Sequence, residues 1–337
     1  MIFRVDGANI HSLAMGHVYR CLKLAVHLVK TRGTEVRFVM RDYPEGVAKV
    51  REYGFPVTPL APDMTLEEEV KTVAQMADGE TLVTDVRRYG PEETATLRGA
   101  AHLHLAFDDL GGRDLCPHVL VNPSVLPKHR NYPELRSDVR YCLGLDYFLL
   151  GSHAAPPCER ISREVYRALV TLGGADPDDY ASAMLPCITP LAHACSFTFV
   201  LGPAYGNAAG FIDQIQAAGL PGRVSVLRDI TDLPSLMTTF DMVITAGGDT
   251  CLESAWSGVP TAIAPTIEYE EETATHMEDL GVAVNLGDIK RIPHHETTGR
   301  LQALMDDFER RHTLSGKGRR LVDGHGADRI TEVLERT

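Results

Sequence analysis

Short apolar segments alternate with amphipathic helical patterns along the whole chain, and this alternation constrains the fold more than any other feature. The first apolar segment, IFRVDG (2–7), is followed by a helical pattern at residues 16–31. The apolar residues of this pattern recur at helical spacing on one face: Val18, Cys21, Leu22, Ala25, Leu28 and Val29. Strands separated by helices form parallel sheets that are covered on both faces. The sequence therefore predicts an α/β architecture.

The alternation occurs in two series, which predicts two domains. The second series contains apolar segments at residues 167–174, 197–202, 241–248 and 260–265. The segment GSHAAPPCER (151–160) is rich in Pro and Ala and separates the two series. A single core rarely grows beyond about 250–300 residues, and this chain has 337. We expect two doubly wound Rossmann-like domains facing a cleft, at residues 1–155 and 156–337.

The composition excludes several classes of function. The net charge of −13 disfavours binding to nucleic acid or to an anionic membrane surface. No apolar signal segment follows the first residues, and prolines interrupt the uncharged stretch 180–212, so we expect neither a leader nor a membrane span. Seven cysteines without CxxC spacing predict reduced thiols, a cytoplasmic location and no zinc site.

The stretch ITAGGDTCLESAWSGVP (244–260) carries the strongest local signal for a ligand. An apolar strand ends at Gly247 and Gly248, and a helix is expected to begin near Thr250. Glycines let a ligand approach the backbone, and the first amides of a helix have no partner within it, so Asp249 and its neighbours can hold a diphosphate. Glu253 would then reach the sugar hydroxyls. Alternatively, Thr250 and Glu253 form a capping box and only stabilise their own helix.

A second loop repeats this arrangement. VTLGGADPDDY (170–180) ends a strand at Gly173 and Gly174 and offers Asp176 as N-cap with Pro177 at the first helical position. The loop is either a tight turn or a second part of a phosphate and sugar pocket. The dinucleotide fingerprint GxGxxG and the phosphate loop GxxxxGK[ST] are absent from the sequence.

Candidate catalytic groups lie at strand ends in the first series. Gly16 and His17 open the helical pattern after the first strand, and Asp6 ends that strand. His17 either packs and caps its helix or moves protons. Asp108 follows another strand and, with its neighbour Asp109, can orient a sugar; alternatively, the pair caps its loop and binds an arginine.

Several motifs together, in this order, resemble one family. They are FRVDG, GHVYRCLKLA, AFDDLGGRDLCPHVLVNP, GLDYFLLG, VTLGGADP, VITAGGDTCLESAWSGVPTAIAP and LVDGHGADRI. Over almost the whole chain they look like the UDP-2,4-diacetamido-2,4,6-trideoxy-β-L-altropyranose hydrolase of pseudaminic acid biosynthesis and the related spore-coat polysaccharide proteins. The resemblance implies a two-domain GT-B glycosyltransferase fold, hydrolysis of a nucleotide-linked sugar with release of UDP, and no metal requirement.

The resemblance also implies roles for individual residues. The glycine–histidine motif of the family matches Gly16 and His17, and implies that this histidine activates water. A neutral imidazole, with a pKa of ~6.5, can accept the proton of an attacking water. Asp6 would orient the ring or bind the sugar. The Gly-Gly-x-Thr-x-x-Glu motif, which binds diphosphate and ribose in the family, matches Gly247, Gly248, Thr250 and Glu253.

The sequence departs from the family where the sugar is expected. An Asn-Gln pair of the family is replaced by an acidic stretch that includes Glu270 and Glu271, which either meets a different sugar or forms a solvated acidic helix start. The Asp-His-Tyr motif keeps only Asp85, with Tyr89 as a possible substitute for its tyrosine. These changes predict that the reaction is retained and that the sugar differs.

We therefore expect a hydrolase that cleaves a nucleotide-sugar, with a UDP-sugar as the substrate class, no cofactor and no metal. Two alternatives remain open at this point. A glycosyltransferase with the same fold would use an acceptor hydroxyl or amine in place of water, because the fold alone does not fix the reaction. A nucleotide-sugar sensor would bind UDP without cleaving any sugar nucleotide. We expect a monomer or a weak dimer, because the sequence has no coiled-coil pattern.

Overall fold

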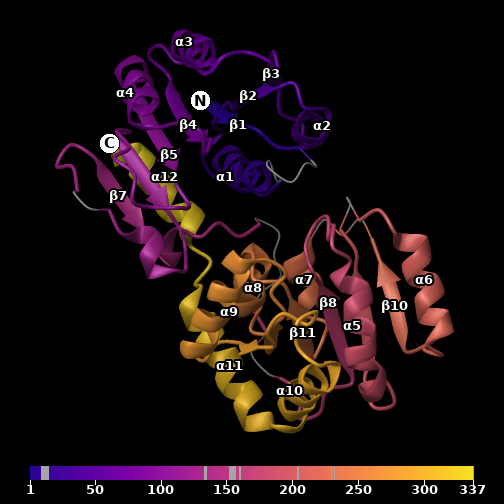
Figure 1. Cartoon of the computed structure of the whole chain (residues 1–337). Coiled ribbons are helices and arrows are strands. Elements are labelled where there is room, and N and C mark those ends of the chain that lie inside the picture. The colour runs from indigo at the N-terminus through magenta and orange to yellow at the C-terminus, as the bar shows by residue number, and fades with distance from the viewer. Residues whose placement is uncertain are drawn as a thin grey trace. The chain divides into compact units, whose positions relative to one another are not determined.

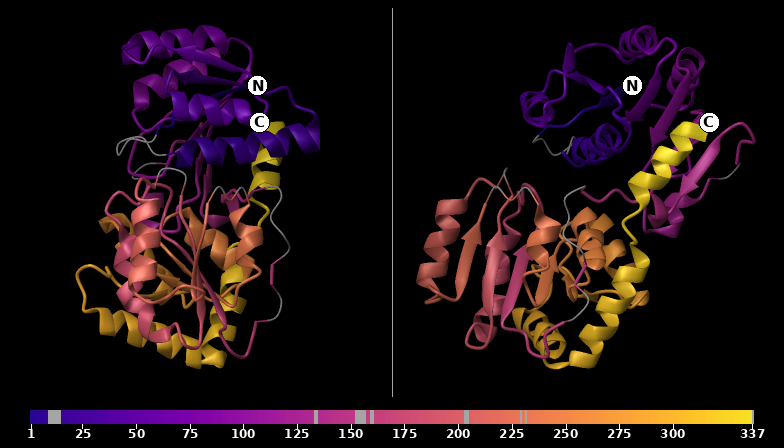
Figure 2. Two further views of the ribbon diagram at one scale, coloured as in Figure 1. Left: turned by 90° about the vertical axis from the view of Figure 1, so that its right-hand side faces the viewer. Right: turned by 180° about the vertical axis from the view of Figure 1, so that it is seen from behind.

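The chain forms two compact units in a computed structural model (Figure 1). Unit 1 comprises residues 1–152 and 324–337, and unit 2 comprises residues 153–323. The structure describes residues 1–8, 15–132, 135–151, 157–158, 161–202, 205–228, 230 and 232–336. Most of the expected linker, 151–160, lies outside these residues. Each unit has a parallel sheet with helices on both faces, so the predicted α/β architecture is confirmed (Figure 2).

Unit 1 is built on a sheet with the strand order β3-β2-β1-β4-β5-β6-β7, in which the paired strands run parallel. Its strands are β1 (Ile2–Val5), β2 (Arg37–Arg41), β3 (Val57–Leu60), β4 (Thr81–Asp85), β5 (Leu103–Phe107), β6 (Val119–Asn122) and β7 (Arg140–Leu143). Its helices are α1 (Gly16–Arg32), α2 (Pro44–Glu52), α3 (Leu66–Met76), α4 (Pro91–Ala100) and α12 (Gly326–Arg336).

Alternation along the strands of unit 1 divides its core into two layers. Phe3 packs with α1, α2 and α12, whereas its neighbour Ile2 packs with α3 and α4 on the other face. The apolar face predicted for α1 is buried with one exception: Val29 is 41% exposed. Leu24 is buried in addition to the predicted residues, so the covered face is wider than the predicted one.

The last helix belongs to unit 1, although the sequence pattern placed residues 324–337 with the second domain. Ile330 and Val333 of α12 are buried in the same core layer as α1. Complete burial of such side chains stabilises the packing by about 1.5–3 kcal/mol each. This amphipathic helix therefore packs where an apolar surface is available, a choice that strand and helix alternation does not encode.

Unit 2 has the strand order β10-β9-β8-β11-β12-β13, again with parallel pairs. Its strands are β8 (Arg167–Thr171), β9 (Ser196–Val200), β10 (Val224–Leu227), β11 (Met242–Thr245), β12 (Thr261–Ile263) and β13 (Val284–Asn285). Its helices are α5 (Tyr180–Ile188), α6 (Ala208–Ala217), α7 (Leu233–Met237), α8 (Asp249–Ser257), α9 (Glu268–Asp279), α10 (His294–Asp306) and α11 (Phe308–Leu321). None of the helices in the described ranges has the length and apolarity needed to cross a bilayer.

Each sheet has one point at which the strand order reverses. In unit 1 the chain builds outward from β1 to β3 and then continues from β4 on the other side of β1. In unit 2 the same reversal separates β8 from β11. Ligands of open parallel sheets bind beyond the carboxyl ends of the strands at such switch points. Most of the candidate site residues lie at the ends of these four strands or in the loops and helices that follow them.

Candidate functional site

Four polar side chains meet at the switch point of unit 1, and we call them the histidine cluster: His17, Arg20, Asp85 and Asp109. His17 stands in the first turn of α1, and Asp85 is the last residue of β4, the strand next to β1. The His17 Nδ1 lies 2.8 Å from the Asp85 Oδ1. Because an ionised carboxylate only accepts hydrogen bonds, Nδ1 carries the hydrogen and Nε2 carries the lone pair. Asp85 thus holds the ring in the tautomer that a general base requires.

Arg20, one turn after His17 on α1, binds both carboxylates of the cluster. Its Nε donates to the Asp85 Oδ2 at 2.8 Å, and its Nη2 donates to the Asp85 Oδ1 at 2.7 Å. The other edge of the guanidinium donates to Asp109, and its plane lies over the Phe107 ring. The carboxylate that orients His17 is therefore itself fixed by a two-point ion pair.

The charges of the cluster set the proton affinity of His17. Burial lowers the pKa of His17, but the Asp85 carboxylate and its hydrogen bond raise it more, so the net pKa lies above the ordinary 6.5. Arg20 acts in the opposite direction and lowers this pKa. Although burial raises the pKa of Asp85, Arg20 and His17 hold it well below its usual range. Asp85 is therefore ionised at neutral pH.

The same side chains have the spacing of a metal site, but their contacts favour a different occupant. Ligand atoms of His17, Asp85 and Asp109 lie within 4.8 Å of one another. The guanidinium of Arg20 already donates to both carboxylates, so a metal ion would have to displace a bound cation. The carboxylates of the histidine cluster are therefore already neutralised by Arg20, and the cluster is not a good metal site.

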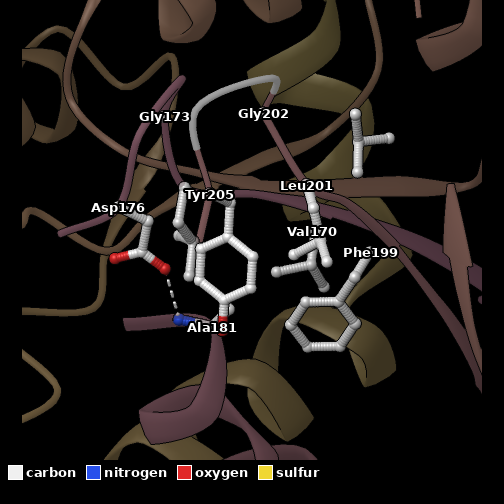
Figure 3. Close-up of a pocket in the computed structure, with 10 residues that line it drawn as sticks. Val170, Gly173, Asp176, Ala181, Phe199, Leu201, Gly202 and Tyr205 are labelled. Carbon is white, nitrogen blue, oxygen red and sulfur yellow. Dashed lines mark hydrogen bonds between the residues drawn. The ribbon is translucent and has the colours of Figure 1, made fainter. Parts of the chain in front are cut away.

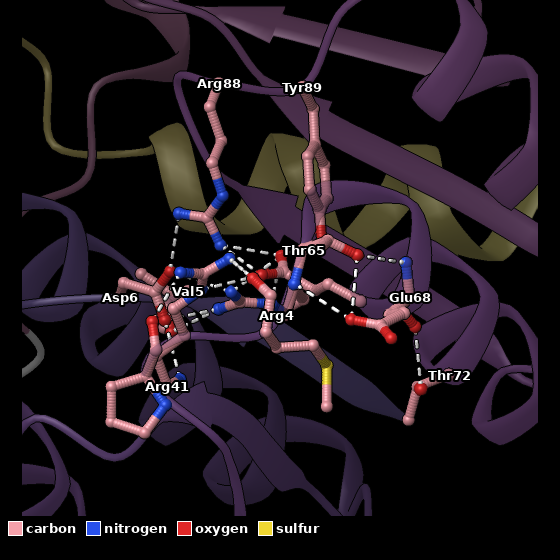
Figure 4. A network of polar contacts seen from close by, with 12 residues as sticks. Arg4, Val5, Asp6, Arg41, Thr65, Glu68, Thr72, Arg88 and Tyr89 are labelled. Atoms are coloured by element: carbon pink, nitrogen blue, oxygen red, sulfur yellow. Dashed lines mark hydrogen bonds and ion pairs between the residues drawn. The ribbon is translucent and has the colours of Figure 1, made fainter.

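Asp6 lies in a second, separate network, which we call the arginine cluster (Figure 4). Its members are Arg4, Asp6, Arg41, Glu69, Arg88 and Tyr89. Asp6 accepts from Arg4 at both oxygens, from the Arg41 backbone amide at 2.8 Å and from Arg88 at 2.9 Å. Burial raises the pKa of Asp6, but Arg4 lowers it by more, so the net pKa lies below its ordinary value. The ring-orienting role that the sequence offered to Asp6 is taken by Asp85, because Asp6 is enclosed by arginines.

Asp108 and Tyr89 also form hydrogen bonds with other groups inside unit 1. The Asp108 carboxylate accepts from the backbone amides of Leu110 and Gly111, from Arg113 at 2.6 Å and from the Tyr132 hydroxyl at 2.7 Å. These contacts match the alternative in which Asp108 caps its loop and binds an arginine. The Tyr89 hydroxyl donates to Glu69 at 2.6 Å. Its contact with Glu69 places Tyr89 in the arginine cluster.

In unit 2, α8 begins one residue earlier than predicted. Its first residue is Asp249 and its N-cap is Gly248, which has no side chain that could cap the helix. Thr250 is therefore the second helical residue, and the capping box with Glu253 is wrong, because that motif requires the threonine at the N-cap. Because α8 follows β11 directly, its N-terminus lies at the carboxyl end of that strand, beside the switch point between β8 and β11. The partial positive charge of a helix N-terminus favours an anion there.

The acidic stretch lies beside this helix start, and two of its glutamates are bonded to neighbouring residues of unit 2. The Glu270 Oε2 accepts from the Thr266 amide at 2.9 Å and from the Thr266 hydroxyl at 2.8 Å, and so ties α9 to the residue before its N-cap. Glu271 pairs with Arg291 at 2.9 Å. These contacts favour the alternative of an acidic helix start. A Cβ on Gly247 would lie 2.7 Å from the Glu270 Cβ, so close packing against α9 explains this glycine without a ligand.

The loop after β8 differs in detail from its prediction. Gly173 has φ +105°, and nothing lies within 4 Å of a Cβ placed on Gly173 or Gly174, so the loop borders open space. The N-cap of α5 is Asp179, not Asp176. Asp176 instead accepts from the amides of Tyr180 and Ala181, each at 2.8 Å, because the chain turns twice through positive φ before the helix begins. The small cavity beside this loop is lined mainly by apolar side chains (Figure 3).

Sequence reasoning missed Arg20 and Glu69. Arg20 is three residues after His17, and residues at this spacing share a helix face, so that signal was available. Glu69 gave no signal, because it occupies an acidic run at the start of α3 that is typical of a helix N-terminus. Its complete burial follows from the arginines of β1 and β2, which only the folded chain brings to it.

Comparison with known proteins gives two relatives of limited identity, and no protein-family model matches the chain. The spore coat polysaccharide biosynthesis protein SpsG of Bacillus subtilis is 25% identical over 233 residues, which are 68% of this chain and 68% of that protein. The uncharacterized protein MJ1062 of Methanocaldococcus jannaschii is 22% identical over 270 residues, 77% of this chain. The latter match spans only 54% of the relative.

Solved structures resemble the chain over nearly its full length. MurG of Acinetobacter baumannii has a TM-score of 0.71 at 12% identity and covers 100% of this chain and 99% of its own. The glycotransferase of kitacinnamycin has a TM-score of 0.66 at 17% identity, with 99% and 98% covered. A putative UDP-N-acetylglucosamine 2-epimerase from Listeria monocytogenes has a TM-score of 0.64 at 12% identity, with 99% and 95% covered. Together with the two parallel sheets, these likenesses show that the chain has the GT-B fold of glycosyltransferases.

Proposed function

We propose that the protein hydrolyses a nucleotide-activated sugar, with a UDP-sugar as the substrate class. The observation that carries this proposal is the His17–Asp85 pair at the switch point of unit 1. A half-buried imidazole whose Nδ1 is held by an ionised carboxylate is a suitable base for a water molecule. The ring nitrogen that remains, Nε2, is the atom that accepts the proton.

In the proposed reaction, the water oxygen attacks the anomeric carbon as Nε2 of His17 takes its proton. The bond between the anomeric carbon and the diphosphate oxygen breaks, and its electron pair leaves with UDP. The free sugar and UDP are the products, and the imidazolium returns its proton to solvent. Asp85 stabilises the imidazolium that forms during the attack, because its charge lies next to Nδ1.

Unit 2 supplies the groups that suit the leaving diphosphate. The amides at the start of α8, at Gly248, Asp249 and Thr250, would bind the phosphate oxygens and stabilise the charge that develops on UDP. Glu253, buried one turn further along α8, would bind the ribose. The open loop at Gly173 and Gly174 ends the neighbouring strand β8 and is a weaker candidate for a phosphate or sugar contact.

The name of the relative from Bacillus subtilis places that protein in polysaccharide biosynthesis. We propose that this chain likewise acts in the biosynthesis of a modified sugar. The acidic residues at the start of α9 stand where the resembled family has amide side chains that contact its sugar, and those amides are missing here. We therefore infer that the sugar differs from the pseudaminic acid precursor.

Glycosyl transfer is the second candidate, and the structural likeness to the glycotransferase of kitacinnamycin favours it. The same His17–Asp85 pair can deprotonate an acceptor hydroxyl. The two reactions differ in one measurable respect. Hydrolysis releases UDP in the absence of any acceptor, whereas transfer requires one.

The test is a screen of UDP-, CMP- and GDP-sugars for nucleotide release without an acceptor. We expect release from at least one UDP-sugar, and a loss of about 100-fold or more in His17→Ala with UDP affinity retained. His102→Ala is the matched control, because this exposed histidine lies at the opposite end of β5 in the same unit. Turnover of His17→Ala within about tenfold of the parent would contradict the general-base role. Release only with an added acceptor would favour transfer.

A further inference from the structure

Arg20 has a geometry that a purely structural ion pair does not require. Its Nη2 lies 3.1 Å from the His17 Nδ1. The two hydrogens of Nη2 are directed to the Asp85 Oδ1 at 2.7 Å and to the Asp109 Oδ2 at 3.1 Å. Since Nδ1 is also a donor, the contact between the arginine and the ring is not a hydrogen bond. It places a positive charge directly against the imidazole.

We propose that Arg20 is a positioning residue that fixes Asp85 for His17 and offsets part of the acidic charge beside the ring, so that the two carboxylates hold the proton on His17 less strongly. This inference rests on the proposed function of His17. It goes beyond that function because it assigns the ionic control of the base to a residue that does not touch substrate. The contacts of Arg20 lie within unit 1 and join α1, the last residue of β4 and the second residue after β5.

The charges that face the ring come from each element packed around it. Asp85 contributes a negative charge from β4, and the Asp109 Oδ2 contributes another 3.8 Å from Nδ1. Arg20 contributes the positive charge from α1. The thiol of Cys21 lies 3.9 Å from Asp85, and burial raises the pKa of that thiol well above its usual value, so it stays neutral. The exposed Arg87 reaches Asp109 at 3.9 Å from the outer side.

This arrangement separates two tasks that Asp85 alone would combine. A buried carboxylate orients an imidazole, but it also favours the imidazolium, which is inactive as a base. With Asp109 nearby, two negative charges would stabilise the protonated ring. The positive charge of the guanidinium offsets one of these negative charges, and its hydrogen bonds keep the Asp85 Oδ1 in place beside the ring. Arg20 therefore permits strong orientation without fixing the proton on His17.

Charge variants test the proposal in the full-length protein. Arg20→Gln leaves two negative charges against the ring, Asp109→Asn leaves none in excess, and the double variant restores the parent balance. We expect the titration midpoint of the His17 Cε1 proton signal, assigned by its loss in His17→Ala, to rise by about one pH unit in Arg20→Gln and to fall in Asp109→Asn. The double variant should titrate near the parent. The acid limb of kcat/KM should follow the same order.

Arg20→Lys separates charge from geometry. A lysine keeps the positive charge but cannot form the two-point contact with Asp85. We expect its titration midpoint to stay near that of the parent while kcat falls by about tenfold or more. A parent-like kcat in this variant would overturn the positioning role. If Arg20→Gln does not fold, Asp109→Asn still tests the charge order, because Asp109 is partly exposed.

The outcomes distinguish this inference from the proposed function. Equal midpoints in all folded variants, with His17-dependent nucleotide release intact, would overturn the role of Arg20 and leave the hydrolase proposal standing. The expected order of midpoints without nucleotide release from any sugar nucleotide would support the charge control of His17 and reject the hydrolase. The NMR midpoint needs no substrate, so the two results are independent.

Discussion

Two networks of arginines and carboxylates lie at the carboxyl edge of the same sheet, and they differ in whether they leave a titratable side chain accessible. In the arginine cluster, Asp6 and Glu69 are almost completely buried and each accepts from several arginines. In the histidine cluster, the same kinds of group surround an imidazole that is 13% exposed. The first network contains no group that titrates near neutral pH. The second contains one such group, the imidazole of His17, and Asp85 holds only its Nδ1.

This contrast shows that composition alone does not identify a catalytic cluster. A buried ion network whose hydrogen bonds are all made holds its elements in one arrangement, and removing one partner leaves an unpaired charge. A reactive group additionally needs an accessible atom with the right protonation state. The histidine cluster meets both conditions, whereas the arginine cluster meets the first alone.

The largest expected effect on stability is that of Glu69→Ala. This change removes the buried carboxylate that Arg4, Arg41 and Arg88 share, and leaves only Asp6 as a carboxylate partner of Arg4 and Arg88. We expect the free energy of unfolding to fall by about 3–5 kcal/mol, measured by urea denaturation. Glu67→Ala, an exposed change on the same helix, is the control and should cost less than about 0.5 kcal/mol. Equal effects of the two changes would remove the distinction between the clusters.

Asp85→Asn should act on turnover more than on stability. Asparagine has nearly the same shape but no charge, so it neither fixes the His17 tautomer nor stabilises the imidazolium. We expect kcat/KM for nucleotide release to fall by about 10²- to 10⁴-fold. Asp114→Asn, at an exposed carboxylate of the same unit, should leave kcat/KM unchanged. A parent-like rate in Asp85→Asn would mean that the pair with His17 has no catalytic role.

Asp6→Asn tests the role that the sequence suggested for Asp6. We expect a loss of about 1–3 kcal/mol of stability, because the amide nitrogen cannot accept from the surrounding arginines. Turnover at a temperature where the variant is folded should stay within about threefold of the parent, which corresponds to less than about 0.7 kcal/mol. A larger loss of turnover in the folded variant would return Asp6 to the catalytic group.

Two adjacent glycines extend the comparison to unit 2. Gly247→Ala places a methyl group 2.7 Å from backbone and side-chain atoms of Glu270, and we expect a loss of about 1–3 kcal/mol of stability. Gly248→Ala meets only the Glu270 Oε1, at 3.6 Å, so the fold should be retained. If this loop holds a diphosphate, Gly248→Ala should weaken UDP binding by about tenfold in calorimetry. Unchanged UDP affinity would place the nucleotide elsewhere.

The smallest expected effect is a pH dependence with opposite signs for activity and stability. The pKa of His17 is raised in the folded state, so its pair with Asp85 contributes stability below the unfolded value of about 6.5 and loses it as pH rises through the folded value. Activity requires the neutral ring and should increase over that same range. Thermal melts and rate profiles across this range check the two signs. A histidine cluster that gains stability as it gains activity would contradict the assignment.

The alternation of strands and helices was sufficient to predict the fold, because a parallel sheet that is buried on both faces requires short, continuous apolar segments that are visible in the local sequence. The sequence also predicted, to within a few residues, the bend at Gly247 and Gly248 and the helix that starts at Gly16. Boundaries were less accurate where caps decide them. The start of α8 at Asp249 and the cap at Asp179 depend on backbone angles that the residue types allow but do not dictate.

Sequence by itself determined the two α/β units and put a histidine, several carboxylates and paired glycines at strand ends. Only the tertiary structure decided which carboxylate serves His17. Asp6 is closer to it along the chain, yet Asp85 reaches it, because β4 lies next to β1 in the sheet and its last residue faces the start of α1. Strand order is set by the packing of the whole sheet, and it brings together residues whose separation in sequence carries no information about their distance in space.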